Sequence, residues 1–304
     1  MPGPDFPSVA EARSLVPGPD SVAWRYAGDA RLFTASGYAL LLQVSHPTVG
    51  AGVTEHSDFK ADPWGRLLRT LDYAYSMVYG GPELATEIGR RVFEMHKRIR
   101  GVKPDGEPYH ALEPDAYAWV HMTLAEAIVA GHERFGRPLR ADQKEALWQD
   151  WLRQAPLIGV RDGEMPGSWT SFRLLFRETV AERLQDTEAV HDVLDTLGKP
   201  TGPPLPALPR ALWPLARVPL SRLGWLATVG LLPPPLRERF GLRWTRAHQA
   251  ELNAVGALSR ATTPLLPRSL RNTGPAYLKA RRKALARGDV AALNPDRRSL
   301  PSAV

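Results

Sequence analysis

The 304-residue sequence contains no cysteine. This absence excludes disulfide bonds, thiolate catalysis, iron–sulfur clusters, thiolate-ligated haem and cysteine-based zinc sites. Any metal must therefore be held by histidine, carboxylate, tyrosine or methionine side chains.

Long apolar runs and several nucleotide and metal motifs are also missing. The longest apolar stretches, 39–44 and 223–232, are shorter than the roughly 20 residues of a membrane-spanning helix. Residues 1–10 lack a basic head followed by an apolar run, so we expect no secretory signal and a cytoplasmic location. The sequence contains no glycine-rich phosphate loop, His-Glu-x-x-His pair or repeated Glu-x-x-His, which argues against nucleotide enzymes, zinc proteases and di-iron bundles.

The charge is moderately basic, with 39 Lys and Arg against 32 Asp and Glu, or +7 in total. Much of the excess lies near the C-terminus and is not interleaved with aromatic platforms or a nucleic-acid reading motif, so we expect no nucleic-acid partner. Apolar residues alternate with arginines between 213 and 226, as at a membrane surface. Core packing explains that stretch more simply, so membrane association is not expected.

Apolar residues recur mainly at helical spacing, and segments of alternating polarity are almost absent, which predicts an all-α fold. The expected helices span 29–46, 63–79, 82–100, 114–135, 142–153, 168–184, 221–229, 235–240, 244–259 and 275–286. We predict an extended N-terminal arm over 1–22, a helical core over 23–197 and a proline-rich linker over 198–219. Residues 220–304 should form a helical extension packed on the core.

Four histidines, His46, His56, His96 and His121, fall within a 76-residue stretch of this thiol-free helical sequence and suggest iron chemistry. A haem ligand must be a neutral imidazole that projects from a rigid element into an apolar slot. His96 and His121 both lie on or beside apolar helical faces, so the pattern cannot choose between them. The histidine that does not bind the iron could bind a haem propionate, hydrogen-bond to the iron-binding histidine, or only pack in the core. Both histidines could also be ordinary core residues.

His46 and His56 flank an expected glycine-containing loop over 46–59. Functional side chains are often carried by loops, so either imidazole could hydrogen-bond a bound oxygen or a reacting substrate. The alternatives are a histidine stabilised at a helix C-terminus for His46 and a solvent-facing loop residue for His56.

The order of short motifs along residues 24–245 resembles the oxygenase family that groups fungal MpaB with the bacterial latex-clearing rubber oxygenases. The motifs are Gly28-Asp29-Ala-Arg, His46-Pro47, Glu55-His56-Ser57, Asp62-Pro63, Arg66-x-x-Arg69-Thr70, Met95-His96, Arg100-Gly101, Trp119-Val-His121, Leu232-Pro-Pro and Phe240-Gly-Leu. Each motif is common alone; their order and spacing make the resemblance specific.

This resemblance implies a globin-like helical bundle with haem b, a histidine axial ligand and oxidation by dioxygen. The family's axial histidine matches His96, and its Arg-x-x-basic-Thr motif matches Arg66, Arg69 and Thr70. These two arginines could bind a haem propionate or polarise a bound peroxide. Rubber oxygenases carry lysine where this chain has Arg69, and arginine keeps its charge and cannot act as a neutral amine. This difference argues against rubber cleavage.

We therefore expect a haem b-dependent oxygenase that uses dioxygen or peroxide to oxidise a small apolar, lipid-like or isoprenoid-like substrate, with electrons from a separate donor if one is needed. The protein would supply orientation, water exclusion and polar groups near the iron. Two alternatives remain. One is a non-catalytic haem- or lipid-binding carrier or sensor, and the other is a haem-free helical protein.

Overall fold

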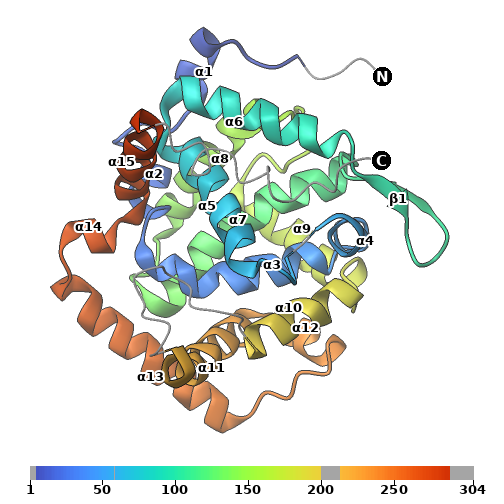
Figure 1. Cartoon of the computed structure of the whole chain (residues 1–304), viewed down its shortest axis with the longest axis vertical. Helices are drawn as coiled ribbons and strands as arrows, with labels where there is room; N and C mark the ends of the chain where they lie inside the picture. The colour runs from blue at the N-terminus through green and yellow to red at the C-terminus, as the bar shows by residue number, and fades with distance from the viewer. Residues whose placement is uncertain (1–4, 58, 200–212, 288–304) are drawn as a thin grey trace.

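The computed structural model describes residues 5–57, 59–199 and 213–287, which fold into a layered assembly of helices (Figure 1). The first elements are α1 (Val9–Leu15), α2 (Val22–Tyr26), the 3₁₀ helix η1 (Ala30–Ala35), α3 (Ser36–Val44), α4 (Pro47–His56), α5 (Pro63–Tyr79) and α6 (Gly81–His96). After a hairpin follow α7 (Pro114–Phe135), α8 (Ala141–Gln154), η2 (Ala155–Ile158), α9 (Trp169–Glu182) and α10 (Glu188–Gly198). The last are α11 (Trp213–Leu231), α12 (Pro234–Arg239), α13 (Arg246–Thr262), η4 (Thr263–Leu265), α14 (Arg268–Arg271) and α15 (Thr273–Ala286).

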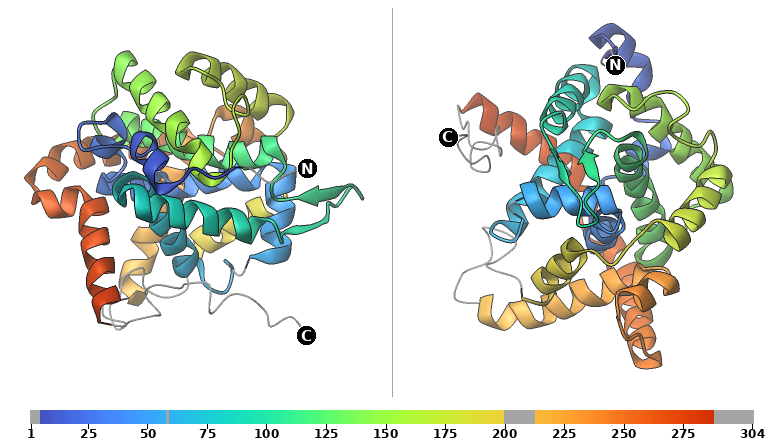
Figure 2. Two further views of the ribbon diagram at one scale, coloured as in Figure 1. Left: turned by 90° about the horizontal axis from the view of Figure 1, so that it is seen from above. Right: turned by 90° about the vertical axis from the view of Figure 1, so that its right-hand side faces the viewer.

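The predicted all-α class is confirmed. In the described ranges, β-structure is limited to one isolated bridge and a hairpin of β1 (Arg100–Val102) and β2 (Pro108–His110). The hairpin is antiparallel, pairs Gly101 with Tyr109, and projects from one side of the molecule (Figure 2). None of the helices in the described ranges has the length and apolar character needed to cross a membrane.

Helix α7 runs through the centre of the fold (Figure 1), and η1, α3, α8 and α13 pack against it. Its side chains are buried on several faces, including Trp119 and Phe135, which is the pattern of a helix surrounded by other helices. The Trp119 Nε1 donates a 2.8 Å hydrogen bond to the carbonyl oxygen of Leu42, so the indole is buried without an unsatisfied donor.

The C-terminal part packs back on the rest of the chain, as expected. Helix α11 lies against α3 and η1, α13 against the end of α7, and α15 against α5. The apolar side chains of Leu232, Leu236 and Leu278 join the same buried cluster as the N-terminal helices. The division between core, linker and extension at residues 197 and 220 stays a prediction.

Four local predictions were wrong. The arm over 1–22 was expected to be extended, but Ser8 and Glu11 form a capping box that starts α1. The loop expected over 46–59 is instead mainly α4, because Pro47 occupies the first turn, where proline's fixed φ favours a helix. The helix expected over 29–46 divides into η1 and α3 and ends at Val44, and the one expected over 82–100 ends at His96.

Part of the predicted linker is also helical. Residues 200–212 lie outside the described residues, but α11 already begins at Trp213 and continues through Pro219. It therefore includes seven residues assigned to the linker, 213–219, and the expected helix over 221–229 is only its second half.

Candidate functional site

His96 is the last residue of α6, and a hydrogen bond within the helix fixes its ring. The Nδ1 atom lies 2.7 Å from the carbonyl oxygen of Val92, one turn earlier. A carbonyl can only accept, so Nδ1 carries the proton and Nε2 carries the lone pair. This tautomer is the one in which a histidine binds a metal through Nε2 while a backbone carbonyl orients its ring.

The surroundings of His96 keep its imidazole neutral. Burial is the main cause that lowers the pKa of His96, and the positive charges of Arg66 and His110 lower it further. The bond to Val92 acts in the opposite direction. The Tyr117 ring meets the imidazole edge-on at 5.4 Å between centroids and restricts its rotation.

His96 and Tyr73 are enclosed by neighbouring residues, but neither side chain is fully buried. Both keep an intermediate share of accessible surface. Burial also raises the pKa of the Tyr73 phenol, which stays protonated.

Helix α5 presents Arg66, Thr70 and Tyr73 on one face, because they are spaced at i, i+4 and i+7. The Thr70 hydroxyl donates to the carbonyl oxygen of Arg66 at 3.1 Å, so its proton is used within the helix. Arg69 lies one position to the side, where its Nη1 is 3.6 Å from Oδ2 of Asp62. Asp62 in turn caps α5 by accepting from the backbone N–H of Gly65.

His121 differs from His96 because both of its ring nitrogens have protein partners. Its Nε2 lies 3.2 Å from the carbonyl oxygen of Trp151, and its Nδ1 lies 3.3 Å from the Tyr73 hydroxyl. Nε2 must therefore donate, and Nδ1 accepts from the phenol. The ring stacks on the Trp151 indole, whose Nε1 donates to the His121 carbonyl oxygen at 2.8 Å. Neither nitrogen offers an unused lone pair to a metal.

Burial lowers the pKa of His121 to about 4, which predicts acid-sensitive folding. An unfolded imidazole titrates near 6.5, so this contribution to stability is complete above about pH 6.5 and is lost as the pH falls toward 4. The loss is about 3 kcal/mol for a difference of about 2.5 pKa units. His121→Gln should therefore show a shallower decrease of unfolding free energy between pH 7.5 and 4.5 in urea titrations.

The half-exposed His191 provides the matched control for this experiment, because its Nε2 pairs with Asp186 at the surface. His191→Gln should keep the wild-type dependence on pH. Equal slopes for the His121 and His191 variants would show that the buried imidazole does not cause the acid sensitivity.

His46 is buried at the start of α4, with its Nε2 3.7 Å from Oδ2 of Asp115. The interaction with His46 is the main cause that lowers the pKa of Asp115 to about 2. His56 is exposed at the end of α4, where its Nε2 lies 3.3 Å from the carbonyl oxygen of Arg100 in β1. Within the described ranges, no recorded contact joins either histidine to His96, so their roles toward a bound oxygen stay predictions.

The structure thus places Arg66 near His96. It also links His121 to helix α5, because the Tyr73 hydroxyl donates to His121. The sequence reasoning missed Tyr73, Val92 and the orienting role of Tyr117. Tyr73 had a detectable signal, because it continues the Arg66–Thr70 face by one turn. Across the described ranges, no group of three or more His, Asp or Glu side chains is placed to hold a metal ion. The donor set at His96 is a single oriented imidazole, which is what a porphyrin-bound iron needs from the protein.

Comparison with known proteins identifies the family. Residues 24–261 match the model of a family described as "ER-bound oxygenase mpaB/B'/Rubber oxygenase, catalytic domain". The chain belongs to this family. The resemblance seen in the sequence motifs is confirmed, and the chain carries an oxygenase catalytic domain of the mpaB/rubber oxygenase type.

Two mycobacterial relatives show the same extent of similarity. Uncharacterized proteins of Mycobacterium bovis and Mycobacterium tuberculosis are each 25% identical to the chain over 232 residues. The matched region covers 75% of this chain and 87% of each relative. No solved structure matches the chain. Helices α14 and α15 lie beyond the region that matches the mpaB/rubber oxygenase model.

Proposed function

We propose that the protein is a haem b-dependent oxygenase with His96 as the axial ligand of the iron. The observation that carries this proposal is the state of the His96 ring. Its Nδ1 proton is held by the Val92 carbonyl, burial favours the neutral form of its imidazole, and its side chain keeps part of its surface accessible. Haem b would supply the iron that reacts with dioxygen or peroxide.

The residues around His96 have separate roles in this proposal. Val92 and Tyr117 orient the imidazole, so that Nε2 keeps one direction. Arg66 disfavours a second proton on His96 and, with Arg69, offers positive charge to a propionate. Tyr73 donates its hydroxyl proton to His121, which fixes the tautomer of that histidine.

We further propose a small apolar substrate of lipid-like or isoprenoid-like character. The Tyr117 ring packs against His96, and the rings of Phe93 and Tyr73 lie near Tyr117, so a substrate bound next to His96 would meet an apolar surface. Arg69 stands where rubber oxygenases carry lysine, so rubber is not the proposed substrate. Dioxygen or peroxide is the oxidant, and a separate donor would supply electrons only if one atom of dioxygen is reduced to water.

An absorption spectrum tests the cofactor. The protein should be expressed with ample haem precursor and measured oxidised, reduced with dithionite, and then exposed to dioxygen. We expect a Soret band that shifts on reduction and shifts again with dioxygen. No porphyrin absorbance after reconstitution with haem would contradict the proposal. A six-coordinate spectrum unchanged by dioxygen or peroxide would instead favour a carrier or sensor.

A further inference from the structure

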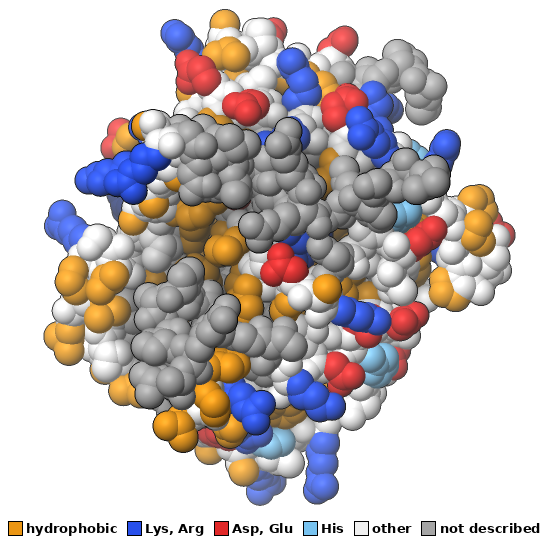
Figure 3. Space-filling model, in the orientation of Figure 1, with side chains coloured by type: hydrophobic (Ala, Val, Ile, Leu, Met, Phe, Trp, Pro, Cys, Tyr) orange, Lys and Arg blue, Asp and Glu red, His pale blue; other side chains and the backbone are white. Residues whose placement is uncertain are grey.

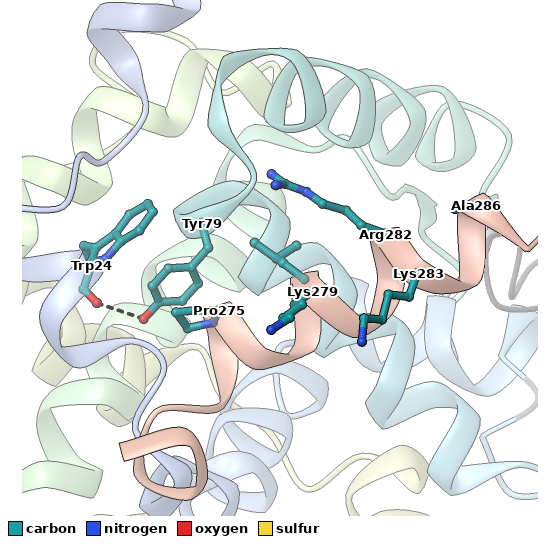
Figure 4. A pocket seen from close by; sticks show the side chains of 8 residues that line it. Trp24, Tyr79, Pro275, Lys279, Arg282, Lys283 and Ala286 are labelled. Carbon is teal, nitrogen blue, oxygen red and sulfur yellow. Dashed lines mark hydrogen bonds between the residues drawn. The ribbon is translucent and has the colours of Figure 1, made fainter. Parts of the chain in front are cut away.

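A cavity of about 540 Å³ lies where α15 crosses α2 and the end of α5 (Figure 4). Trp24, Tyr79 and Leu278 form its apolar side, and Lys279, Arg282 and Lys283 of α15 bring positive charge to it. The side chain of Arg282 extends from α15 toward the two aromatic rings. Lys and Arg side chains also gather over α15 on the molecular surface, at the upper left of Figure 3.

This cavity is separate from the His96 site. Arg66 and Tyr79 lie near opposite ends of α5, thirteen residues apart. A helix rises 1.5 Å per residue, so Tyr79 lies roughly 20 Å along α5 from Arg66 and roughly 9 Å from Tyr73. Neither Arg66 nor Tyr73 is among the residues described as lining the cavity. Most of the described lining residues belong to α15. This helix lies outside the residues that match the oxygenase family. The family resemblance therefore does not account for the cavity.

The charges that line the cavity differ from those that hold α15 in place. Arg281 is buried, with its Nε 3.0 Å from Oδ1 of Asp72, and the Tyr277 hydroxyl donates to the same carboxylate at 2.6 Å. By contrast, Lys279, Arg282 and Lys283 are exposed, and no ion pair is recorded for them within the described part of the chain. Among the residues that the structure describes, no acidic side chain lines the cavity. Its positive charge is thus available to a ligand.

The apolar side of the cavity is held rigidly. The Tyr79 hydroxyl donates a 2.9 Å hydrogen bond to the carbonyl oxygen of Trp24, and the two rings meet edge-on at 4.8 Å. At the start of α15, Gly274 lies so close that a Cβ there would sit 2.2 Å from Cε2 of Tyr79. Only glycine lets the helix approach the ring so closely. The aromatic wall is therefore formed before any ligand arrives.

We propose that this cavity binds a small amphipathic anion, with its carboxylate or phosphate against Arg282 and its apolar group against Trp24 and Tyr79. Small-molecule sites usually occupy 300–1,000 Å³ and combine an apolar lining with a few polar groups, and this cavity meets both conditions. The fixed rings of Trp24 and Tyr79 give a single molecule a preformed apolar contact, so the proposed ligand is a monomeric molecule. The site does not depend on the proposed haem chemistry.

Calorimetric titration of the full-length protein with decanoate and with decyl phosphate tests this proposal. The uncharged decanol and inorganic phosphate serve as comparison ligands that each lack one half of the amphipathic probe. In the double variant Lys279→Glu/Arg282→Glu, decyl phosphate should bind about 10-fold to 100-fold more weakly, because hydrogen bonds to the anion are lost. Arg287→Glu, just beyond α15 and outside the cavity, is the matched control and should bind like the wild type.

Several results would overturn the proposal. Equal affinity in the double variant and the control would show that the cavity does not bind the anion. Decanol binding as tightly as decanoate would remove the role of charge, and inorganic phosphate binding as tightly as decyl phosphate would remove the role of the apolar group. Charge-dependent binding to phosphatidylglycerol vesicles without binding of either monomeric probe would identify a membrane surface instead. Unchanged circular dichroism and melting temperature would show that α15 stays folded in the variants.

Discussion

His96→Ala is expected to abolish the Soret band of the haem-loaded protein while leaving its helical content unchanged. The substitution removes the imidazole of His96. The bond from Nδ1 of this ring to the Val92 carbonyl leaves the lone pair of Nε2 for a metal. His96 is the last residue of α6, and alanine is a good helix former, so the helix should persist. Absorption and far-ultraviolet circular dichroism spectra of the same samples measure both effects.

Two further variants separate ligation from folding. His191→Ala removes a half-exposed imidazole on α10 and should keep the full Soret band. His96→Gly leaves a space that imidazole from solution can fill, so added imidazole should restore haem binding to this variant. An unchanged Soret band in His96→Ala, or no effect of imidazole on His96→Gly, would refute the assignment of His96 as ligand.

The long helices of the fold were predictable because their ends carry local signals. Pro63 and Pro114 each occupy the first turn of their helices, and both start positions agree with the structure. The end of α7 was predicted near Phe135, which is the last residue of the helix. In these segments the helical spacing of apolar residues and the end signals agree, so tertiary contacts only reinforce the local preference.

Helix α4 shows where local signals mislead. Its sequence from Pro47 contains Gly50 and Gly52, which read as a flexible loop. Gly50 instead fits a tight contact, because a Cβ at this position would lie 2.5 Å from the carbonyl oxygen of Val44. The glycine is required by packing against a neighbouring element, and the sequence alone does not reveal that requirement.

The tie between His96 and His121 could not be settled from the sequence for the same reason. Both lie on apolar helical faces, and what separates them is the set of hydrogen-bond partners. Val92 is four residues before His96 and could have been anticipated, but Tyr73 and Trp151 lie 48 and 30 residues from His121. Such long-range partners follow only from the packing of α5, α7 and α8.

Gly89→Ala is expected to destabilise the fold and to weaken haem binding. Gly89 is buried where α6 crosses η2, and a Cβ there would lie 2.0 Å from the carbonyl oxygen of Leu157. The backbone of η2 would have to move, which costs about 1–3 kcal/mol for an overpacked core and exceeds the gain of about 1 kcal/mol from alanine in a helix. Urea unfolding and haem titration measure the two effects.

The effect should reach His96 through Tyr117. The Tyr117 hydroxyl donates a 3.0 Å hydrogen bond to the carbonyl oxygen of Ile158 in η2, and its ring packs against the His96 imidazole. Displacement of η2 therefore shifts the ring that orients the ligand. Gly224→Ala is the matched control, because its Cβ would meet Leu197 at an ordinary 3.7 Å, and the helix should gain about 0.5–1 kcal/mol. If the Gly89 variant were as stable as this control and bound haem equally well, η2 would not be the support that holds Tyr117 against His96.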